Sequence, residues 1–341
     1  MEKIAYFYPE GHEKHSELGH PERPERVEVI RQALQAGDLW DEQALLYPIE
    51  LPEDILLSVH TSDYIKYLYT SCQNGYHIDS DTYTTPATWE LAHRTAGGAI
   101  AVGMSVWKGD SRRGFALTRP PGHHATAGQG MGFCILNNIA ITAEYLIKQA
   151  AAKRLAIIDL DLHHGNGTQD IFWKRGDVFY ISTHQSPLYP GTGMLSETGA
   201  GDGAEKTANF PLPPGSGNQA FLAILNEIIL PILDRYDPEM ILVSYGFDPH
   251  WRDPLGHLKL SADVYGEIIS SLARWADEHC SGRIALFLEG GYDLEAAAAC
   301  SLSVVSALLG SRWEDSMGLS PEPEGKSWQS VLKQAKEIWG L

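Results

Sequence analysis

The polar and apolar positions of this chain follow two alternating patterns, short apolar runs and longer amphipathic stretches. Runs rich in Ile, Val and Phe predict strands at residues 4–8, 114–118, 155–162, 178–183, 240–245 and 284–290. Helical periodicity predicts helices at residues 22–36, 87–107, 137–151, 219–235, 261–279, 294–309 and 326–338. Because the strands are apolar on both faces, we expect a mainly parallel sheet with helices on both faces, an α/β fold. No linker divides the pattern, so we expect a single domain over residues 1–341, with the Gly- and Pro-rich segment 190–218 as a long loop.

The composition limits the possible classes of binding partner more than it limits the fold class. The apolar fraction of 43% is too high for a disordered chain. The formal net charge of −18 would repel phosphates, so we expect no nucleic-acid partner. Such a surface could attract basic peptides or polyamines, although solubility alone also accounts for it.

The cysteines and the longest apolar run bear on the compartment. Cys72, Cys134, Cys280 and Cys300 are scattered without a C-x-x-C pair, which favours reduced thiols. The N-terminal residues contain no apolar signal core. The run at 296–310 is rich in Ser and shorter than the roughly 18 apolar residues that a membrane span needs. We therefore expect a cytoplasmic protein with no membrane partner.

Four unusual polar segments each follow a predicted strand. They are "RPPGHHA" (119–125), "DLDLHHGNG" (159–167), "YGFDPHWRDPLG" (245–256) and "EGGYD" (289–293). In an open parallel sheet, ligand sites are built at the carboxyl ends of the strands. The four segments together therefore predict one functional site at that edge.

The second and third segments contain candidate metal ligands. Asp161 and His163 are two residues apart, so their side chains point the same way if the strand pattern continues. A catalytic zinc site uses three protein ligands and leaves a further position open for water. Asp248 is the candidate for the third ligand. A lone Asp-x-Asp is more typical of a turn or cap, but the whole D-x-D-x-H-H-G segment at a strand end favours a metal site.

The first segment contains two adjacent histidines after a Pro-Pro-Gly turn. In an irregular loop, the rings of His123 and His124 could both face one pocket and hold or transfer protons. Asp159 and Asn166 are available to fix their other ring nitrogens. A lone histidine is more often structural, and we assign no role to the ten histidines outside the two His-His pairs.

Tyr292 follows two glycines in the fourth segment. Gly290 and Gly291 allow a close backbone approach and unusual dihedrals. A phenol presented there could donate a hydrogen bond to a carbonyl oxygen that gains negative charge. Most tyrosines only fill space, but the position at the predicted active edge favours a function.

These segments, with "GFCILNN" (132–138) and "YPGTG" (189–193), resemble the histone deacetylase superfamily. That superfamily also contains acetylpolyamine amidohydrolases and acetoin-utilization proteins. The resemblance is strongest over about residues 5–310 and includes "GHPERPERVEVI" (19–30) and "VHTSDYI" (59–65). Asn166, where class I members have Asp, and the "HPERPER" wording are more like class II enzymes and their bacterial relatives.

The resemblance implies an arginase-like fold and a zinc-dependent amide hydrolase that removes acetyl groups. It implies zinc on Asp161, His163 and Asp248, a site whose ligands Fe(II) would also accept. Family members often bind potassium below the zinc loop, which implies a potassium site here through Asp159 and backbone carbonyls near Asp161, His163 and Ser182.

The resemblance also implies roles for the other polar residues. It makes His124, paired with Asn166, the general base and then the general acid. It makes His123 an electrostatic partner held by Asp159, and Tyr292 the donor to the oxyanion.

The substrate-binding residues implied by the resemblance are Gly132, Phe133, Tyr189 and Leu255. Phe133 and Tyr189 would be the walls of a narrow acyl-lysine tunnel, although many members have Phe where Tyr189 stands. Leu255 would lie near the tunnel mouth, where polyamine-specific relatives have Glu.

Several alternatives stay open. The substrate could be an acetyl-lysine peptide, an acetylated polyamine or a small arylamide, because all contain the same amide. A binuclear manganese ureohydrolase would need a second set of carboxylates, and a non-catalytic acyl-lysine binding module predicts a missing ligand or tyrosine. The sequence does not decide the oligomeric state, so a homo-oligomer also stays open.

Overall fold

One sheet organises the molecule. In the computed structural model, which describes residues 4–341, seven parallel strands pair in the order β1-β2-β7-β6-β3-β4-β5. The strands are β1 (Ile4–Phe7), β2 (Arg113–Ala116), β3 (Leu155–Asp159), β4 (Val178–Gln185), β5 (Thr207–Leu212), β6 (Met240–Tyr245) and β7 (Ile284–Leu288). This confirms the predicted α/β fold, and the sheet is parallel throughout.

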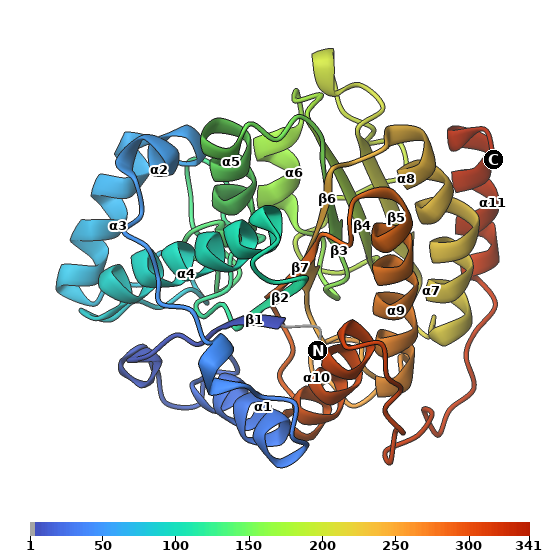
Figure 1. The fold of residues 1–341 in the computed structure, drawn as a ribbon, viewed down its shortest axis with the longest axis horizontal. Helices are drawn as coiled ribbons and strands as arrows, with labels where there is room; N and C mark the ends of the chain where they lie inside the picture. Colours follow the sequence, from blue (N-terminus) through green and yellow to red (C-terminus); the bar gives the residue numbers. More distant parts are fainter. Residues whose placement is uncertain (1–3) are drawn as a thin grey trace.

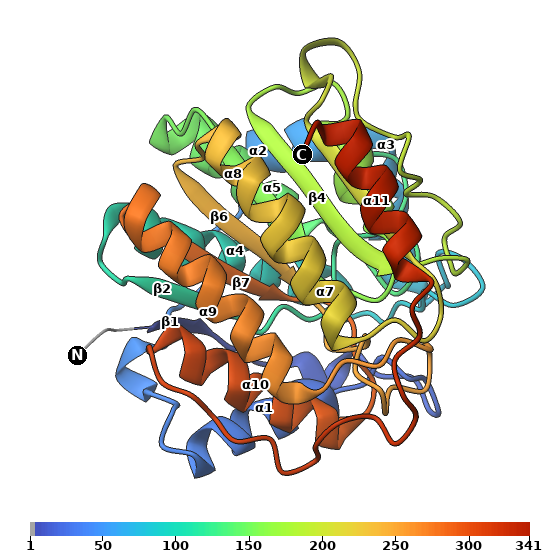
Figure 2. The ribbon, with the colours of Figure 1, turned by 90° about the vertical axis from the view of Figure 1, so that its right-hand side faces the viewer.

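Helices cover both faces of the sheet, as the doubly apolar strands predict (Figure 1). One face packs against α1 (Glu25–Ala36), α7 (Asn218–Ile224), α8 (Leu230–Tyr236), α9 (Ala262–His279), α10 (Leu294–Leu308) and α11 (Trp328–Trp339). Figure 2 shows α7, α8, α9 and α11 in front of the strands on this side. The other face packs against α2 (Glu53–Val59), α3 (Ser62–Asn74), α4 (Thr88–Lys108), α5 (Asn138–Ala150) and α6 (Asn166–Phe172).

The strand side chains divide between two buried cores. In β3, Ala156 and Ile158 belong to one core, while Leu155 and Ile157 belong to the other. All four are fully buried. Side chains alternate between the faces of a strand, so a strand that is apolar throughout is buried only when both faces are covered. The polar residues that follow β3 are therefore presented from a rigid strand.

The strand order brings the four polar segments together. The segments follow β2, β3, β6 and β7, and these four strands are neighbours in the sheet in the order β2-β7-β6-β3. Because all strands are parallel, their carboxyl ends meet at one edge. The predicted site edge is therefore formed by consecutive strands.

The expectation of a long loop over 190–218 is wrong for six of its residues. Thr207–Leu212 forms β5, which pairs with β4 at the edge of the sheet. Ala208, Phe210 and Leu212 enter the core at alternate positions. Pro211 concealed this strand in the sequence, yet an edge strand tolerates proline because one side needs no backbone donor.

The helix predicted at 219–235 is also interrupted. It consists of α7, a π-helical turn at Leu225–Ile229 and α8. Pro231 lies at the start of α8, and a proline cannot donate the backbone hydrogen bond that an uninterrupted helix requires. The pattern did not predict α2, α3 or α6. The last is a short helix that begins at Asn166, within the second polar segment.

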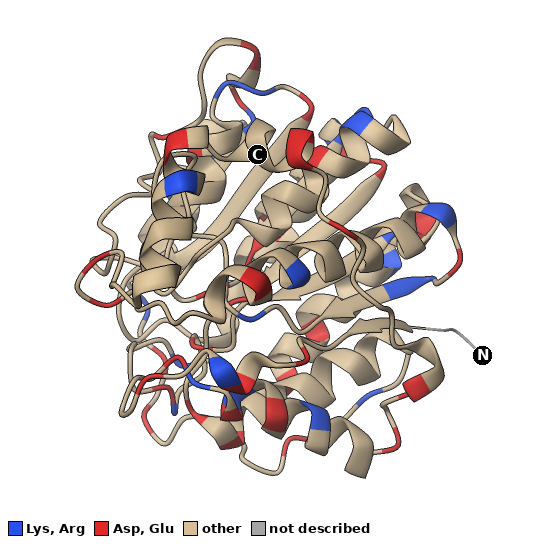
Figure 3. Ribbon diagram, turned by 90° about the vertical axis from the view of Figure 1, so that its left-hand side faces the viewer, with Lys and Arg blue, Asp and Glu red and all other residues tan. Residues whose placement is uncertain are grey.

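On at least one side of the molecule the charged positions are not gathered by sign. Acidic and basic positions are interspersed on the side of the molecule that Figure 3 shows. Within residues 4–341, no helix has both the length and the apolar character that a membrane crossing requires.

Candidate active site

The three predicted metal ligands converge at the carboxyl edge of the sheet. Their ligand atoms all lie within 4.8 Å of one another. His163 Nδ1 lies 3.3 Å from Asp161 Oδ1 and 3.1 Å from Asp248 Oδ2. Both carboxylates are buried, with exposed fractions of 0% for Asp161 and 1% for Asp248. The structure therefore brings together the residues that the sequence proposed.

The local geometry differs from the continued strand that we expected. Strand β3 ends at Asp159, so Asp161 and His163 lie beyond it. Their arrangement depends on backbone donors: the His163 N–H donates to Asp161 Oδ1 at 2.9 Å, and the Leu162 N–H donates to Asp248 Oδ1 at 3.0 Å. Each carboxylate is thus fixed by the chain that surrounds the cluster.

Two glycines make room for these carboxylates. A Cβ atom at Gly246 would lie 2.1 Å from Asp161 Oδ2, and one at Gly290 would lie 2.4 Å from Asp248 Oδ2. The Gly290 N–H also donates to Asp161 Oδ2 at 2.7 Å. The first glycine of the Gly-Gly pair is therefore required for space around the cluster. Gly291 has a φ of +109°, so the second is required for its backbone conformation.

The electrostatics of the cluster fit a divalent cation. Burial and the neighbouring Asp161 raise the pKa of Asp248 to about 7. Burial opposes protonation of His163, but hydrogen bonds to Asp161 and Asp248 outweigh it and raise its pKa to about 10. Asp161 and Asp248 thus share the proton on His163 Nδ1. A cation that replaced the shared proton would compensate both, and carboxylate oxygen and imidazole nitrogen are ligands that zinc accepts.

The two adjacent histidines face one pocket, as expected for an irregular loop. Their ring centroids are 4.1 Å apart. His123 Nδ1 lies 3.0 Å from Asp159 Oδ2, and His124 Nδ1 lies 2.8 Å from Asn166 Oδ1. Both pairings agree with the sequence proposal.

The two imidazoles differ in charge. Burial disfavours protonation of His123, but Asp161 and Asp159 outweigh it and raise its pKa to about 10. Burial lowers the pKa of His124 far below its usual value, and the charges of His123 and His163 lower it further. His124 is therefore neutral. Its Nδ1–H donates to Asn166, so its Nε2 is left to accept a proton.

Tyr292 lies beside this group in a buried position. Its ring is 5.7 Å from Phe133, edge to face, and its backbone N–H donates to Asp253 Oδ2 at 2.6 Å. Burial raises the pKa of Tyr292 well above its usual value. The phenol therefore stays protonated and can donate a hydrogen bond.

The other proposed substrate-binding residues lie around the same group. The Tyr189 ring, which is 39% exposed, lies 5.2 Å from the ring of His124. A Cβ atom at Gly132 would lie 2.6 Å from His124 and 2.9 Å from Tyr189. Leu255 is partly buried against the core, and its N–H donates to Asp253 Oδ1 at 3.0 Å.

The sequence analysis missed the residues that hold the Tyr292 segment. Arg26, which is fully buried, donates to the carbonyls of Gly291 and Glu289, both at 2.5 Å, and its guanidinium lies 4.9 Å from the centre of the Tyr292 ring. Burial opposes ionisation of Glu22, but Arg119 and Arg26 outweigh it and lower its pKa to about 2. The signal was the charged "HPERPER" segment, which we quoted for its family resemblance without assigning a role to any of its residues.

A second cluster of potential ligands lies nearby. His123, Cys134 and Glu289 bring ligand atoms within 4.8 Å of one another. Their polar atoms already have protein partners: Glu289 Oε2 accepts from the Gly122 and His123 N–H groups, and Cys134 Sγ accepts from the His124 N–H. Across residues 4–341, the Asp161–His163–Asp248 cluster is the only one of these groups with two carboxylates. The second carboxylate set that a binuclear manganese site needs is therefore not found there.

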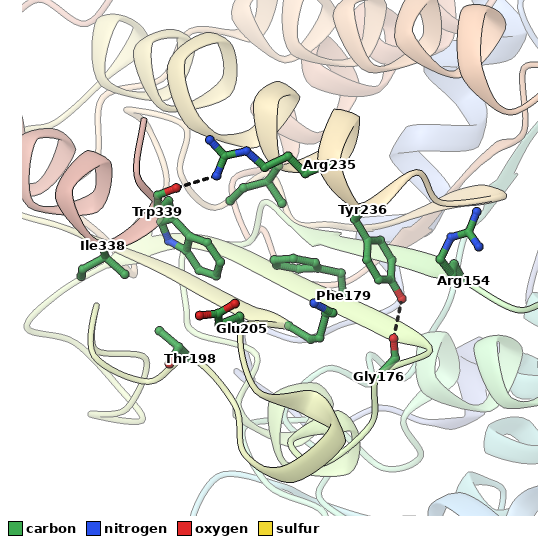
Figure 4. Close-up of a pocket in the computed structure, with 11 residues that line it drawn as sticks. Arg154, Gly176, Phe179, Thr198, Glu205, Arg235, Tyr236, Ile338 and Trp339 are labelled. Atoms are coloured by element: carbon green, nitrogen blue, oxygen red, sulfur yellow. Dashed lines mark hydrogen bonds between the residues drawn. The ribbon is translucent and has the colours of Figure 1, made fainter.

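A separate cavity lies at the amino ends of the strands, away from the candidate active site. It has a volume of about 490 Å³ and lies near the amino ends of β3, β4 and β5, between Arg154, Phe179, Tyr236 and Trp339 (Figure 4). It contains none of the proposed site residues.

The fold and the site together define an α/β protein with a cluster of candidate metal ligands at the carboxyl edge of its sheet. The sequence model of the Histone deacetylase domain matches residues 20–308. A probable deacetylase of Archaeoglobus fulgidus is 40% identical over 294 residues, which cover 85% of this chain and 82% of that protein. The histone deacetylase-like amidohydrolase of Pseudomonas aeruginosa is 34% identical over 86% of this chain and 78% of that protein.

A solved structure gives the same result. The crystal structure of the HDA15 HD domain matches with a TM-score of 0.88 and 32% identity, covering 99% of this chain and 94% of that chain. This chain belongs to the histone deacetylase family.

Proposed function

We propose that this protein is a metal-dependent hydrolase that removes acetyl or related acyl groups from an amine such as acetyl-lysine. One observation carries the proposal: the buried Asp161–His163–Asp248 cluster lies beside a neutral imidazole, that of His124. Membership in a family of deacetylases and amidohydrolases supports it. The acetylated amine would be the partner of this site.

Zn(II) is our first candidate for the ion, and Fe(II) would accept the same ligands. A divalent cation held by these three residues would supply Lewis-acid activation of the amide carbonyl and of a water molecule. A potassium ion near Asp159 stays a prediction from the family resemblance.

His124 would transfer the proton, and His123 would supply a fixed positive charge. His124 Nε2 takes a proton from the attacking water and later gives it to the leaving amine, because its Nδ1–H is already committed to Asn166. The protonated ring of His123, which Asp159 holds, places a positive charge beside the reacting group. Acetate and a free amine are the products.

Tyr292 would donate to the substrate carbonyl oxygen as that oxygen gains negative charge. Its hydroxyl stays protonated because burial raises its pKa. Arg26 and Asp253 hold the backbone on both sides of this residue in place, so the phenol is pre-positioned. Phe133 and Tyr189 would line the path of the acyl-lysine side chain.

A direct test uses the purified protein with an acetyl-lysine peptide. We expect a chelator to abolish release of acetate and added Zn(II) or Fe(II) to restore it, because catalysis needs the cation. A panel of acetylated peptides, acetylpolyamines and arylamides then ranks the substrates. Full activity in protein whose metal content is shown to be zero would contradict the proposal.

Replacing Tyr292 with Phe tests the oxyanion donor. Tyr292→Phe should lower kcat about a hundredfold or more, since this is the usual scale for one lost oxyanion donor. KM and metal content should change little, because the phenyl ring still packs against Phe133. Steady-state kinetics with metal analysis measure both, and an unchanged kcat would remove Tyr292 from the mechanism.

Leu255 tests substrate choice. An apolar side chain offers a second substrate ammonium nothing in exchange for its lost hydration, so we expect acetyl-lysine peptides to be better substrates than acetylspermidine. Leu255→Glu should shift the ratio of the two kcat/KM values toward acetylspermidine by about tenfold. Diffuse surface charge is screened by salt, so the assay is run at physiological ionic strength. A wild-type preference for acetylspermidine there would show that Leu255 does not set the choice.

A further inference from the structure

The carboxylate of Glu197 holds the turn at residues 192–194, which follows Tyr189 in the chain. Glu197 Oε2 accepts from the Gly193 N–H at 3.2 Å and from Gln169 Nε2 at 2.7 Å. Glu197 Oε1 accepts from the Met194 N–H at 3.1 Å. The carboxylate therefore ties two successive backbone donors of the turn to α6.

Two buried histidines support the same turn from below. His164 Nε2 lies 3.0 Å from Gln169 Oε1, and His164 Nδ1 lies 2.7 Å from the Thr192 hydroxyl. The amide Oε1 can only accept, so His164 carries its proton on Nε2 and accepts from Thr192 on Nδ1. His184 Nε2 in the same way donates to the Gly193 carbonyl at 3.0 Å.

Gly193 fits closely over these rings. It has a φ of +84°, and a Cβ atom there would lie 2.6 Å from the rings of both His164 and His184. The backbone therefore lies directly on the two imidazoles. His164 contacts this turn and α6 rather than the candidate metal cluster.

Helix α6 links this turn to the catalytic groups. Its first residue, Asn166, pairs with His124. One turn later on the same helix, Gln169 holds Glu197. Asn209 of β5 adds to the link, because its Nδ2 donates to Gln169 Oε1 at 2.7 Å and to the Glu197 carbonyl at 3.2 Å. One turn of a short helix thus holds the imidazole through Asn166 and the turn after Tyr189 through Gln169.

We propose that Glu197 is a positioning residue for substrate binding, which through Gln169 and α6 fixes the Tyr189 wall relative to His124. The inference rests on the proposed function for its kinetic consequence, whereas its structural consequence is independent of activity. Glu197 does not touch the reacting atoms on this account, so its loss should weaken substrate binding more than it slows the chemical step.

The Glu197→Gln variant tests this with little change in shape. The amide NH₂ group must replace either Oε1, which accepts from Met194, or Oε2, which accepts from Gly193 and Gln169. An NH₂ group cannot accept, so at least one of these hydrogen bonds is lost. We expect KM for an acetyl-lysine peptide to rise about tenfold while kcat stays within about twofold. Metal content should be unchanged.

The matched control is Glu205→Gln in the same region of the chain. Within residues 4–341, no hydrogen bond or ion pair joins the Glu205 carboxylate to another group, so this variant loses the same charge without unfastening the turn. Amide hydrogen exchange over residues 188–198 should be faster in Glu197→Gln and unchanged in Glu205→Gln. This readout remains informative if the wild-type protein shows no deacetylase activity, which would count against the proposed function alone.

Thr192 provides a milder second pair if Glu197→Gln does not fold. Thr192→Val removes the hydroxyl from His164 Nδ1 at an exposed position, and Thr192→Ser keeps it. The valine variant should show the same faster exchange and a KM increase of about threefold, and the serine variant should restore both. Unchanged exchange in the valine and glutamine variants, or a loss of kcat at constant KM, would overturn the assignment.

Discussion

The rest of the site depends on two carboxylates that are buried side by side. Asp161 and Asp248 lie at the carboxyl edge of the sheet with almost no exposure and with one imidazole, His163, between them. Burying a carboxylate is costly unless it is paired and hydrogen-bonded. Backbone N–H groups of the surrounding chain donate to both carboxylates, and glycines leave space for them. A divalent cation would complete the compensation.

The same constraint explains why the neighbouring groups differ in charge. His123 lies between Asp159 and Asp161 and is held protonated, with its pKa raised to about 10. His124 is next to it in the chain and pairs with the amide of Asn166, but burial and the positive charges of His123 and His163 lower its pKa far below the usual value, so it stays uncharged. Two identical residues thus acquire different protonation states because carboxylates surround one ring, whereas burial and two charged imidazoles act on the other. A proton acceptor and a fixed positive charge are the result.

The sequence predicted those parts of the site that local pattern and family resemblance carry. The strand ends, the metal cluster and the pairing of His123 and His124 were identified because each lies in a short, unusual segment, although their chemical roles stay predictions. Arg26 was not identified, because its backbone partners are more than 260 residues away in the chain. Glu197 and strand β5 were missed for a similar reason: a glutamate in a Gly-rich segment and a strand with a proline have meaning only once β4 and α6 lie beside them. The roles of such residues are set by tertiary contacts and not by local sequence propensity.

The central claim is that Asp161, His163 and Asp248 hold one divalent cation. Anomalous diffraction at the zinc absorption edge, from crystals of the protein prepared with Zn(II), tests it most directly. The account predicts a single strong peak among the side chains of these three residues. A peak at His123, Cys134 and Glu289 instead, or no peak at the Asp161–His163–Asp248 cluster in zinc-loaded crystals, would contradict it.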